Sequence, residues 1–410
     1  MKKVVIPAFI FVHSLGLLAD DWPQWRGPNR DGVSRETGLL QAWPSDGPKR
    51  LWLSRDIGIG YSAPVVANGM LFILGTKDDK EQLFAKEVKS GRTLWTAALG
   101  GILNNNWGDG PRGAATVDGK LVYALGAKGG LVCSNVSDGK VLWRKELVED
   151  FGGKAPYWGY SESLLVDGDL VICTPGGQRG TLAALDKKTG EVIWRSGNWT
   201  DGAQYASVMP AEFNGKRQLI QLTQKTLAGI SINDGSVLWR NAWPGRTAVI
   251  PTPILLRDGV YISSGYGVGS RKVSIGVGHK VTEDYSNKNM KNHHGGVLLL
   301  DGHLYGYSDG RGWTCQNLES GEVVWDSKKL GKGCVVYADN RLYCLAESSG
   351  TITLAAADTR GWKEHGRFKL EPQTELRKPS GRIWTHPVVA NGVMYLRDQE
   401  LLFAFDVMVR

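Results

Sequence analysis

The chain has 410 residues, of which 42% are hydrophobic and 22% charged, so it is able to bury a large core and lacks the composition of a disordered protein. Its 54 glycines and 16 tryptophans indicate many tight turns between large packing residues, which is typical of an all-β protein. The net charge is +8 without any block of arginine or lysine, which argues against nucleic acid as a partner.

The first residues have the features of an export signal. Lys2 and Lys3 precede an apolar run that ends at Leu18. This run is too short for a comfortable membrane span, and no second hydrophobic stretch follows it. We therefore expect residues 1–19 to be a signal peptide and residues 20–410 to form a single domain without a transmembrane segment, periplasmic or secreted.

The five cysteines form no Cys-x-x-Cys motif, no haem-attachment motif and no adjacent pair; they are Cys133, Cys173, Cys315, Cys334 and Cys344. All five fall in expected strands, where a small buried role is typical. Because no cysteine precedes Cys133, lipid attachment at the expected cleavage point is excluded. Cys334 and Cys344 flank one hairpin, so they are the pair for which a disulfide has to be tested.

Two-residue turn signals recur along the chain, and a β-rich run follows each one. Asn-Gly and Asp-Gly tolerate positive φ at both central positions, which favours type I′ hairpins. Eight such signals occur at spacings of 38 to 52 residues: Asn68-Gly69, Asp118-Gly119, Asp167-Gly168, Asn214-Gly215, Asp258-Gly259, Asp301-Gly302, Asp339-Asn340 and Asn391-Gly392. A period of this length predicts a repeat architecture.

A second marker follows in most copies, where a glycine stands four residues before a tryptophan. The pairs are Gly91 and Trp95, Gly139 and Trp143, Gly190 and Trp194, Gly235 and Trp239, and Gly321 and Trp325. We expect each tryptophan to pack between its own copy and the next. The fifth and seventh copies lack the tryptophan, and the fifth contains an insertion over residues 265–292 that is either a lid or a long hairpin.

Each copy supplies about four strands, and the ends of the chain complement each other. The final copy, from Trp384 to Val409, has only about three strands, whereas residues 51–53 form an orphan strand before the first complete copy. Pairing these two parts would close a ring and remove exposed sheet edges. The sequence therefore predicts an all-β fold: an eight-bladed β-propeller of four-stranded antiparallel blades in which an N-terminal strand closes the last blade.

These repeats carry a family resemblance. GTLAALDKKTGEVIW (180–194) and GLVCSNVSDGKVLW (130–143) resemble repeats of the PQQ-binding-like, or quinoprotein-type, β-propeller family, whose fold is shared by the outer-membrane assembly factor BamB. DWPQWRGPNRDG (21–32) and NKNMKNHHGG (287–296) are similar to segments of secreted members from planctomycete-like bacteria. The resemblance covers essentially the whole mature chain and is specific for fold rather than activity.

Quinoprotein alcohol dehydrogenases are similar to this chain in their repeats, and that likeness implies pyrroloquinoline quinone (PQQ) and calcium as cofactors. They are considerably longer, however, and typically carry an adjacent cysteine pair that contacts the quinone. This sequence has no such pair, and their Glu, Asn and Asp calcium ligands cannot be matched to its residues. The resemblance therefore favours the repeat as architecture over a bound quinone.

In a propeller, the connections between blades and those between the second and third strands emerge on one face, which we call the loop face. In this sequence these connections are rich in aromatic rings for stacking and in polar groups for directional hydrogen bonds. The candidate ligand-binding residues are Trp107, Arg112, Trp158, Tyr160, Glu162, Gln204, Tyr205, His293, His294, Asp309, Arg311, Arg382, Trp384 and His386. For any single tryptophan, packing at the channel mouth or between blades is an equally good interpretation.

The sequence assigns no catalytic residue and no metal site. His293 and His294 would point to opposite faces of a strand and cannot hold one ion without a loop or bulge. Asp309 and Arg311 are expected beside His293, as a pair that orients a ligand or as a solvated turn. Glu162 and Asp309 come from different blades, so paired-carboxylate catalysis is unsupported.

The leading hypothesis is a monomeric, exported binding or scaffold propeller that engages a protein, peptide or glycan through its loop face. The alternative is a PQQ- and calcium-dependent oxidoreductase, and a third candidate is a hydrolase or lyase acting on a polysaccharide. An assembly-factor role like that of BamB is a special case of the first hypothesis, weakened by the missing lipid-anchor cysteine.

Overall fold

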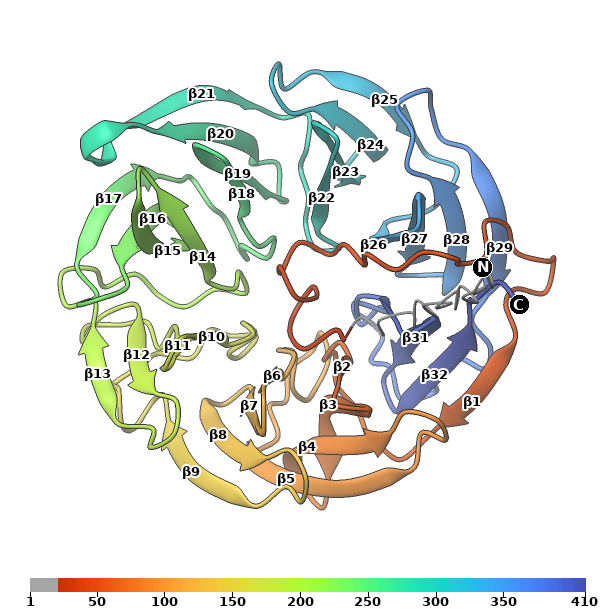
Figure 1. Cartoon of the computed structure of the whole chain (residues 1–410), viewed down its shortest axis with the longest axis horizontal. Helices are drawn as coiled ribbons and strands as arrows, with labels where there is room; N and C mark the ends of the chain where they lie inside the picture. Colours follow the sequence, from red (N-terminus) through yellow and green to blue (C-terminus); the bar gives the residue numbers. More distant parts are fainter. Residues whose placement is uncertain (1–20) are drawn as a thin grey trace, which may run out of the picture.

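The computed structural model describes residues 21–410; the expected signal peptide lies outside the described residues. The described chain forms eight four-stranded antiparallel sheets, which stand as blades around a central channel (Figure 1). The predicted eight-bladed propeller is confirmed. Within residues 21–410, no helix has the length and hydropathy that a membrane crossing requires.

Each blade extends from an inner strand at the channel to an outer strand at the rim. From the channel outward, the first blade contains β2 (Val65–Ala67), β3 (Met70–Lys77), β4 (Lys80–Glu87) and β5 (Thr93–Gly101). The second contains β6 (Thr116–Asp118), β7 (Leu121–Leu125), β8 (Gly130–Asn135) and β9 (Val141–Glu146). The third contains β10 (Leu165–Asp167), β11 (Leu170–Cys173), β12 (Ala183–Asp186) and β13 (Val192–Arg195). The fourth contains β14 (Met209–Phe213), β15 (Lys216–Leu222), β16 (Thr226–Ser231) and β17 (Val237–Ala242).

The remaining blades follow the same order. The fifth contains β18 (Ile254–Leu256), β19 (Gly259–Ser264), β20 (Gly269–Ile275) and β21 (Val281–Asn287). The sixth contains β22 (Val297–Leu300), β23 (His303–Ser308), β24 (Gly312–Asn317) and β25 (Val323–Ser327). The seventh contains β26 (Gly333–Ala338), β27 (Arg341–Ala346), β28 (Thr351–Ala356) and β29 (Glu364–Lys369). The eighth contains β30 (Val388–Ala390), β31 (Val393–Asp398), β32 (Leu401–Asp406) and β1 (Arg50–Ser54).

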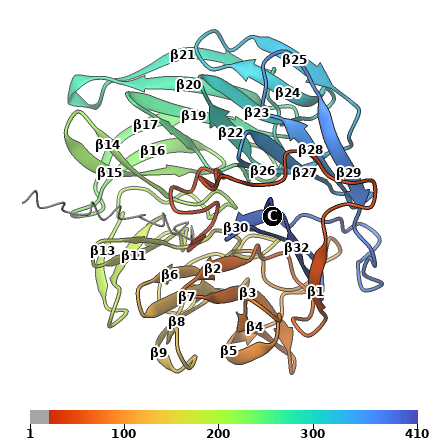
Figure 2. The ribbon, with the colours of Figure 1, turned by 45° about the vertical axis from the view of Figure 1, so that its right-hand side comes forward.

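The ring closes through β1, as the sequence predicts. β1 pairs antiparallel with β32, with Trp52 opposite Ala404, and Figure 2 shows the two strands side by side. The strand that is first in the chain thus becomes the outer strand of the last blade, which leaves no blade incomplete.

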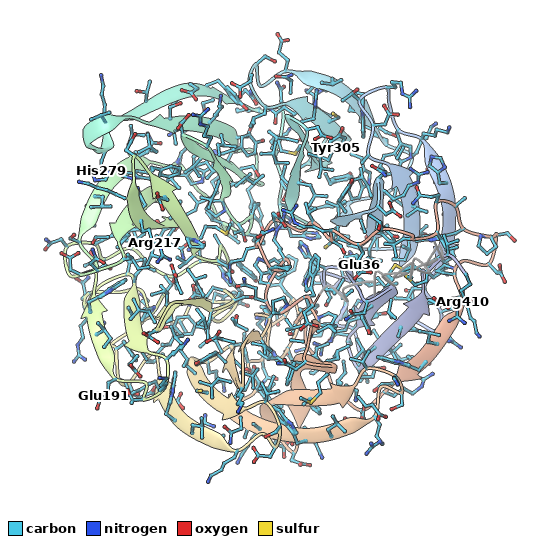
Figure 3. The ribbon with its side chains drawn as sticks, in the orientation of Figure 1. Glu36, Glu191, Arg217, His279, Tyr305 and Arg410 are labelled. Carbon is cyan, nitrogen blue, oxygen red and sulfur yellow. The ribbon has the colours of Figure 1, made fainter. Side chains whose placement is uncertain are left out.

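The insertion in the fifth copy is a long hairpin rather than a lid. It forms β20 and β21, and a short 3-10 turn, η1 (Val277–His279), stands at its tip. Figure 3 shows side chains filling the space between the blades, with His279 of this tip, Glu191 and Arg410 at the outer edge of the ring. The hydrophobic core therefore lies between neighbouring blades; one cluster, for example, joins Val65 and Phe72 of the first blade to Val122 of the second.

The predicted turns connect the first and second strands of each blade, but they are not all of one type. Both central residues have positive φ in five of them, including Asn68-Gly69 and Asn391-Gly392, as type I′ requires. At Gly119 and Gly168 the glycine alone is left-handed and takes the first loop position, as in type II′. In the fifth blade the two-residue loop is Arg257-Asp258, one residue earlier than predicted, and Gly259 is the first residue of β19.

The repeated glycine and tryptophan belong to one docking contact between neighbouring blades. Trp95 of β5 donates its indole N–H to the carbonyl of Val136 in the second blade, over 3.0 Å. Its ring covers Gly139, where a Cβ atom would lie 2.4 Å from the ring. Trp143 makes the same contacts with Lys187 and Gly190 of the third blade. Trp194 and Trp325 also donate to carbonyls of the next blade, those of Ile232 and Asp358. The predicted packing is therefore confirmed for four of the five tryptophans and is wrong for Trp239.

The fourth blade departs from this pattern because the fifth blade has no glycine at the equivalent place. Trp239 turns back and donates to Oε1 of Gln218 in its own blade, over 2.6 Å. In the fifth blade Tyr285 replaces the tryptophan, packs on Gly321 of the sixth and donates its hydroxyl to the carbonyl of Leu318, over 2.9 Å. Tyrosine is thus able to supply the ring of this contact.

We expect Gly139→Ala to lower the free energy of unfolding by about 2 kcal/mol more than Gly69→Ala does, because overpacking against Trp95 adds to a shared backbone cost. Both glycines have positive φ, of 72° and 73°, but a Cβ at Gly69 would meet no atom within 4 Å. Urea unfolding of the two variants measures the difference. Equal losses would show that the ring yields to the added methyl group and that the docking contact has little steric specificity.

Residues 21–35, which we call the channel segment, lie inside the ring. Figure 1 shows this part of the chain in red, running through the centre of the propeller. Trp22 exchanges backbone hydrogen bonds with Val66 of β2, and the carbonyl of Pro23 accepts one from Val117 of β6. On the opposite side, Ser34 donates to the carbonyl of Tyr337 in β26. The channel segment therefore satisfies edges of inner strands that would otherwise face the open channel.

Candidate functional site

A cavity of about 290 Å³ opens among the connections of the loop face. Eight of the fourteen candidate residues predicted from the sequence line it: Trp107, Arg112, Trp158, Tyr205, His293, His294, Trp384 and His386. Its other lining residues are Trp25, Tyr61, Tyr157, Ser161, Ser163, Thr247, Ala248, Ile250 and Tyr266.

The cavity is built from one position of the repeat. Seven lining residues stand four residues before the inner strand of their blade: Tyr61, Arg112, Ser161, Tyr205, Ile250, His293 and Trp384. Because the inner strands surround the channel, the residues at this position meet at its mouth. Tyr266 comes instead from the turn between β19 and β20. Both kinds of connection thus meet at one cavity, as the propeller topology predicts.

The walls of the cavity are aromatic rings in mutual contact. Trp158 stacks on Tyr205 with ring centroids 5.5 Å apart, and Tyr61 lies 5.2 Å from Trp384. Trp25 of the channel segment meets His386 edge to face at 4.7 Å. Pairs at these separations are favourable beyond their buried area, so the rings hold one another in place without a ligand.

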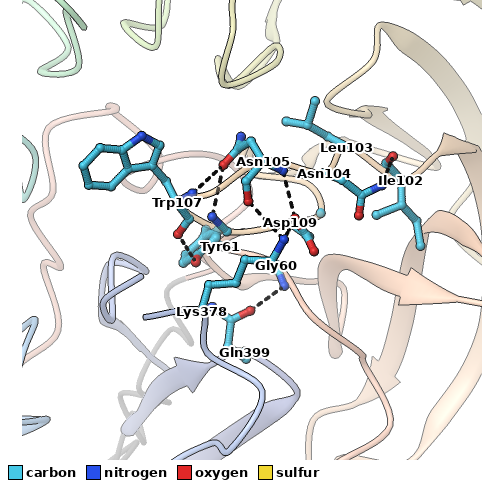
Figure 4. A network of polar contacts seen from close by, with 12 residues as sticks. Gly60, Tyr61, Ile102, Leu103, Asn104, Asn105, Trp107, Asp109, Lys378 and Gln399 are labelled. Atoms are coloured by element: carbon cyan, nitrogen blue, oxygen red, sulfur yellow. Dashed lines mark hydrogen bonds and ion pairs between the residues drawn. The ribbon is translucent and has the colours of Figure 1, made fainter. Parts of the chain in front are cut away.

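Trp107 projects from a loop whose backbone is fixed by side chains (Figure 4). Oδ1 of Asn105 accepts the backbone N–H of Trp107 over 2.9 Å, and the hydroxyl of Tyr61 donates to the Trp107 carbonyl over 3.2 Å. Lys378 bridges the carbonyl of Asn105 and Oδ1 of Asp109. Trp107 as a whole is 54% exposed. A large ring is therefore presented to solvent on a rigid support.

Arg112 is a cation in the cavity wall with no carboxylate partner. Its guanidinium donates to the carbonyls of Gly108 and Gly110, each over 2.7 Å, and lies 5.4 Å from the centre of the Tyr61 ring. Among the residues that the structure describes, no aspartate or glutamate forms an ion pair with it. These contacts orient the guanidinium without a direct carboxylate partner.

His293 is held in one tautomer by Lys332. The ammonium of Lys332 lies 2.7 Å from Nδ1 of His293 and forms a 2.7 Å ion pair with Asp309. Since lysine has no acceptor, Nδ1 must accept and Nε2 must carry the proton. Burial, together with the positive charges of His294 and Lys332, lowers the pKa of His293 to about 3. His293 is therefore a neutral N–H donor at physiological pH.

Glu347, His294 and Cys334 are connected in the same order as the members of a catalytic triad, but the thiol of Cys334 is not ionised. Nε2 bonds a carboxylate oxygen of Glu347, Nδ1 lies 3.5 Å from Sγ of Cys334, and Glu347 also accepts the indole N–H of Trp384 over 3.0 Å. Cys334 is fully buried, and burial raises the pKa of its thiol well above its usual value. The thiol thus stays protonated, and the network orients His294 and Trp384.

The other six predicted residues lie outside the cavity lining, and three of them are buried in the blades. Tyr160 donates to the carbonyl of Pro175, Oε1 of Gln204 accepts the backbone N–H of Val249, and Glu162 accepts from Thr174. Their neighbours Ser161 and Ser163 do line the cavity. The loop runs extended into β10, so successive side chains face alternately toward the cavity and the blade.

The remaining three lie on the surface around the cavity. Asp309 is near His293 as expected, but it pairs with Lys332 rather than with Arg311. Arg311 pairs with Asp326 on β25. Arg382, which stands two residues before Trp384, donates to the carbonyls of Pro379 and Gly381.

Sequence reasoning missed Trp25, Tyr61 and Tyr266. Trp25 lies 227 residues from Thr252, to which its indole donates over 3.0 Å, so no local pattern places it in the cavity. Tyr61 occupies the shared position four residues before an inner strand, and aligning the copies on that strand would have found it. Tyr266 is in the fifth-blade insertion, at a residue with positive φ.

The cysteines carry no cross-link. All five are free and buried. Cys334 pairs with Leu345 across the β26–β27 ladder, and Cys344 pairs with Val335. Adjacent ladder positions point to opposite faces of the sheet, so the one candidate disulfide is not formed.

Comparison with known proteins identifies the family. A sequence model described as outer membrane protein assembly factor BamB matches residues 79–327. The chain belongs to this family. A BamB-family relative from Yersinia pestis, an outer membrane protein assembly factor, is 21% identical over 308 residues, which cover 69% of this chain and 70% of the relative.

Solved structures show the shared fold. BamB from Moraxella catarrhalis is 14% identical to this BamB-family chain and has a TM-score of 0.60, covering 88% of this chain and 99% of the other. Quinohemoprotein alcohol dehydrogenase from Comamonas testosteroni is 12% identical with a TM-score of 0.65, covering 95% of this chain and 81% of the other. At these identities the likeness establishes the propeller fold and leaves the ligand open.

The cavity of this BamB-family chain does not fit the calcium ion that a quinoprotein likeness implies. Calcium takes six to eight oxygen ligands, commonly including carboxylates. None of the lining residues is an aspartate or glutamate. Within the described part of the chain, no three His, Cys, Asp or Glu side chains are grouped so as to hold a metal ion.

Proposed function

We propose that this propeller is a binding module whose cavity on the loop face holds a ring at the end of a protein, peptide or glycan ligand. The observation that carries the proposal is the set of aromatic rings that converge on the cavity from six blades and the channel segment. A concave site lined by rings with a few placed polar groups is the usual form of a ligand pocket.

The rigidity of the site favours tight recognition. Trp107 is fixed through its backbone, and Trp384 through its indole N–H to Glu347. Rings that are ordered before binding lose little conformational freedom when the ligand arrives, so more of the contact energy contributes to affinity. Exposed Trp107 and Tyr157 extend the aromatic surface beyond the cavity, which suits a ligand longer than one ring.

The protonation states of the site favour binding over acid-base chemistry. His293 stays neutral and has Nδ1 occupied by Lys332, and both ring nitrogens of His294 are engaged with Glu347 and Cys334. The guanidinium of Arg112 has donors and no acceptor. These groups supply fixed donors, as a recognition site requires.

Trp107→Ala is expected to weaken binding at least tenfold without changing Tm, since an exposed ring contributes contact area but little packing. The measurement is quenching of tryptophan fluorescence during titration with oligosaccharides and short peptides that end in a sugar or aromatic ring. Leu142→Ala, an exposed side chain on β9 in the outer part of the second blade, is the control. Equal affinities of both variants would exclude the cavity as the binding site.

A protein partner during outer-membrane assembly is the second candidate, and membership of the BamB family favours it. This role would require export, for which residues 1–19 have the expected composition. A peptide with the alternating aromatic residues of an outer-membrane strand should then displace an oligosaccharide from the cavity. Peptide binding that persists in Trp107→Ala would place the protein-binding surface elsewhere. Fractionation of tagged cells tests the export.

A further inference from the structure

The polar groups of the cavity are mainly donors. Arg112 has five N–H groups, of which two serve the carbonyls of Gly108 and Gly110, and its guanidinium also interacts with the hydroxyl of Tyr205. His293 offers Nε2–H, since Lys332 occupies its other nitrogen. Unpaired donors in a partly buried site favour a ligand rich in acceptors.

The acceptors near the cavity are already used. Asp309 pairs with Lys332, Asp109 pairs with Lys378, and Glu347 is held by His294 and Trp384. Buried Glu81 accepts the backbone N–H groups of Leu103 and Ala127. No carboxylate lines the cavity, so the Arg112 guanidinium is the cation that an anionic ligand would meet in its wall. An anionic group placed beside Arg112 would gain a charge-assisted, bidentate contact that a neutral group cannot make.

A second uncompensated cation lies beside the cavity. Arg382 donates to the carbonyls of Pro379 and Gly381, and no carboxylate in the described chain pairs with it. Gly381 packs against the backbone of Trp107, where a Cβ would lie 3.1 Å from the Trp107 carbonyl oxygen. The segment that carries Arg382 thus packs against the loop that presents Trp107 at the cavity.

We propose that the cavity selects an acidic sugar, a pyranose ring with a carboxylate that Arg112 binds while the aromatic walls contact the ring. This inference rests on the proposed function and names its ligand class. Hydroxyl groups of Ser161 and Thr247 in the lining are suited to the sugar hydroxyls, because each is able both to donate and to accept. Arg382 and Trp107 then receive the next acidic unit of the chain.

The test is calorimetric titration of the whole chain with two oligosaccharides that differ only in their terminal unit, glucuronate or glucose. We expect the glucuronate-terminated probe to bind at least tenfold more tightly, and its affinity to fall as salt rises from 20 to about 300 mM because salt screens the charge contact. Benzoate is titrated as a ring that carries a carboxylate but no hydroxyl groups. This comparison uses the unaltered protein.

Arg112→Gln is expected to abolish the preference for glucuronate, because it removes the charge that distinguishes the two probes; a tenfold preference corresponds to about 1.4 kcal/mol of charge-assisted contact. Arg246→Gln, an exposed arginine of the fourth blade's connection outside the cavity lining, is the matched control.

Equal affinity of the two oligosaccharides, or an unchanged preference in Arg112→Gln, would overturn this inference and leave the proposed function standing. Benzoate binding as tightly as the glucuronate probe would replace the acidic sugar with an aromatic acid. If neither the anionic nor the neutral ring-terminated probe binds, the proposed function itself fails.

Discussion

Replacing Arg30 by alanine should lower the free energy of unfolding by about 3 to 5 kcal/mol, the usual loss when one member of a buried charged network is removed. Its side chain is buried and donates to the carbonyls of Ser163 and Leu164, over 2.8 and 3.0 Å, and to Oε1 of Gln24, over 2.9 Å. The substitution leaves these acceptors short of a donor. Urea unfolding monitored by fluorescence measures the loss.

Arg360→Ala is the matched control, because Arg360 is 88% exposed and pairs only with neighbouring Asp358 among the described residues. We expect no measurable change in that variant. The Arg30 variant should also bind ligand less well, since Ser163 lines the cavity. A loss as small as that of the control would mean that the channel segment is attached to the ring without stabilising it.

The propeller could be predicted because its signals are local. A turn such as Asn214-Gly215 is specified by two residues whose backbones tolerate positive φ. The Gly139 and Trp95 contact joins neighbouring blades, yet each partner recurs at a fixed place in its own copy. Closure by β1 followed from counting strands, which needs no knowledge of side-chain contacts.

The cavity was only partly predictable, because its residues meet through the ring and not through the chain. Trp158 and Tyr160 stand two residues apart in one loop, yet the first lines the cavity and the second is buried against Pro175. Gly159, which lies between them with a φ of 78°, interrupts the alternation of the extended chain and separates the two side chains, and composition does not reveal this. Trp25 reaches the cavity only because the channel segment enters the ring. The side chains of Arg26 and Arg30 hold that segment there by donating to the carbonyls of Val297 and Leu164, which belong to distant blades.

Glu162 gives the second large effect, which is a dependence of stability on pH. Burial raises the pKa of this carboxyl to about 7, even though Thr174 donates two hydrogen bonds to it and Arg30 lies nearby. Between about pH 4.5 and 7 the native carboxyl keeps its proton while the unfolded one releases it. The native state then binds more protons, so stability is full below pH 4.5 and is lost as pH rises through 7.

Glu162→Gln should remove that loss, which amounts to about 3 kcal/mol for a shift from 4.5 to about 7. Glutamine keeps an acceptor for the Thr174 backbone N–H and carries no charge at any pH. We expect the variant to be more stable than the wild type at pH 8 and similar to it at pH 5, as measured by urea unfolding across this range.

The comparison of variant and wild type isolates Glu162 from other buried groups. His293 and His386, whose pKa values burial lowers, act in the opposite sense, because the unfolded chain takes up their protons as pH falls below 6.5. Both histidines are present in wild type and variant, so their effect cancels in the difference. Glu149→Gln, at an exposed carboxyl in the same blade connection, should leave the pH profile unchanged. A Glu162→Gln profile parallel to that of the wild type would show that the carboxylate is ionised in the fold and that the buried guanidinium of Arg30 compensates its charge.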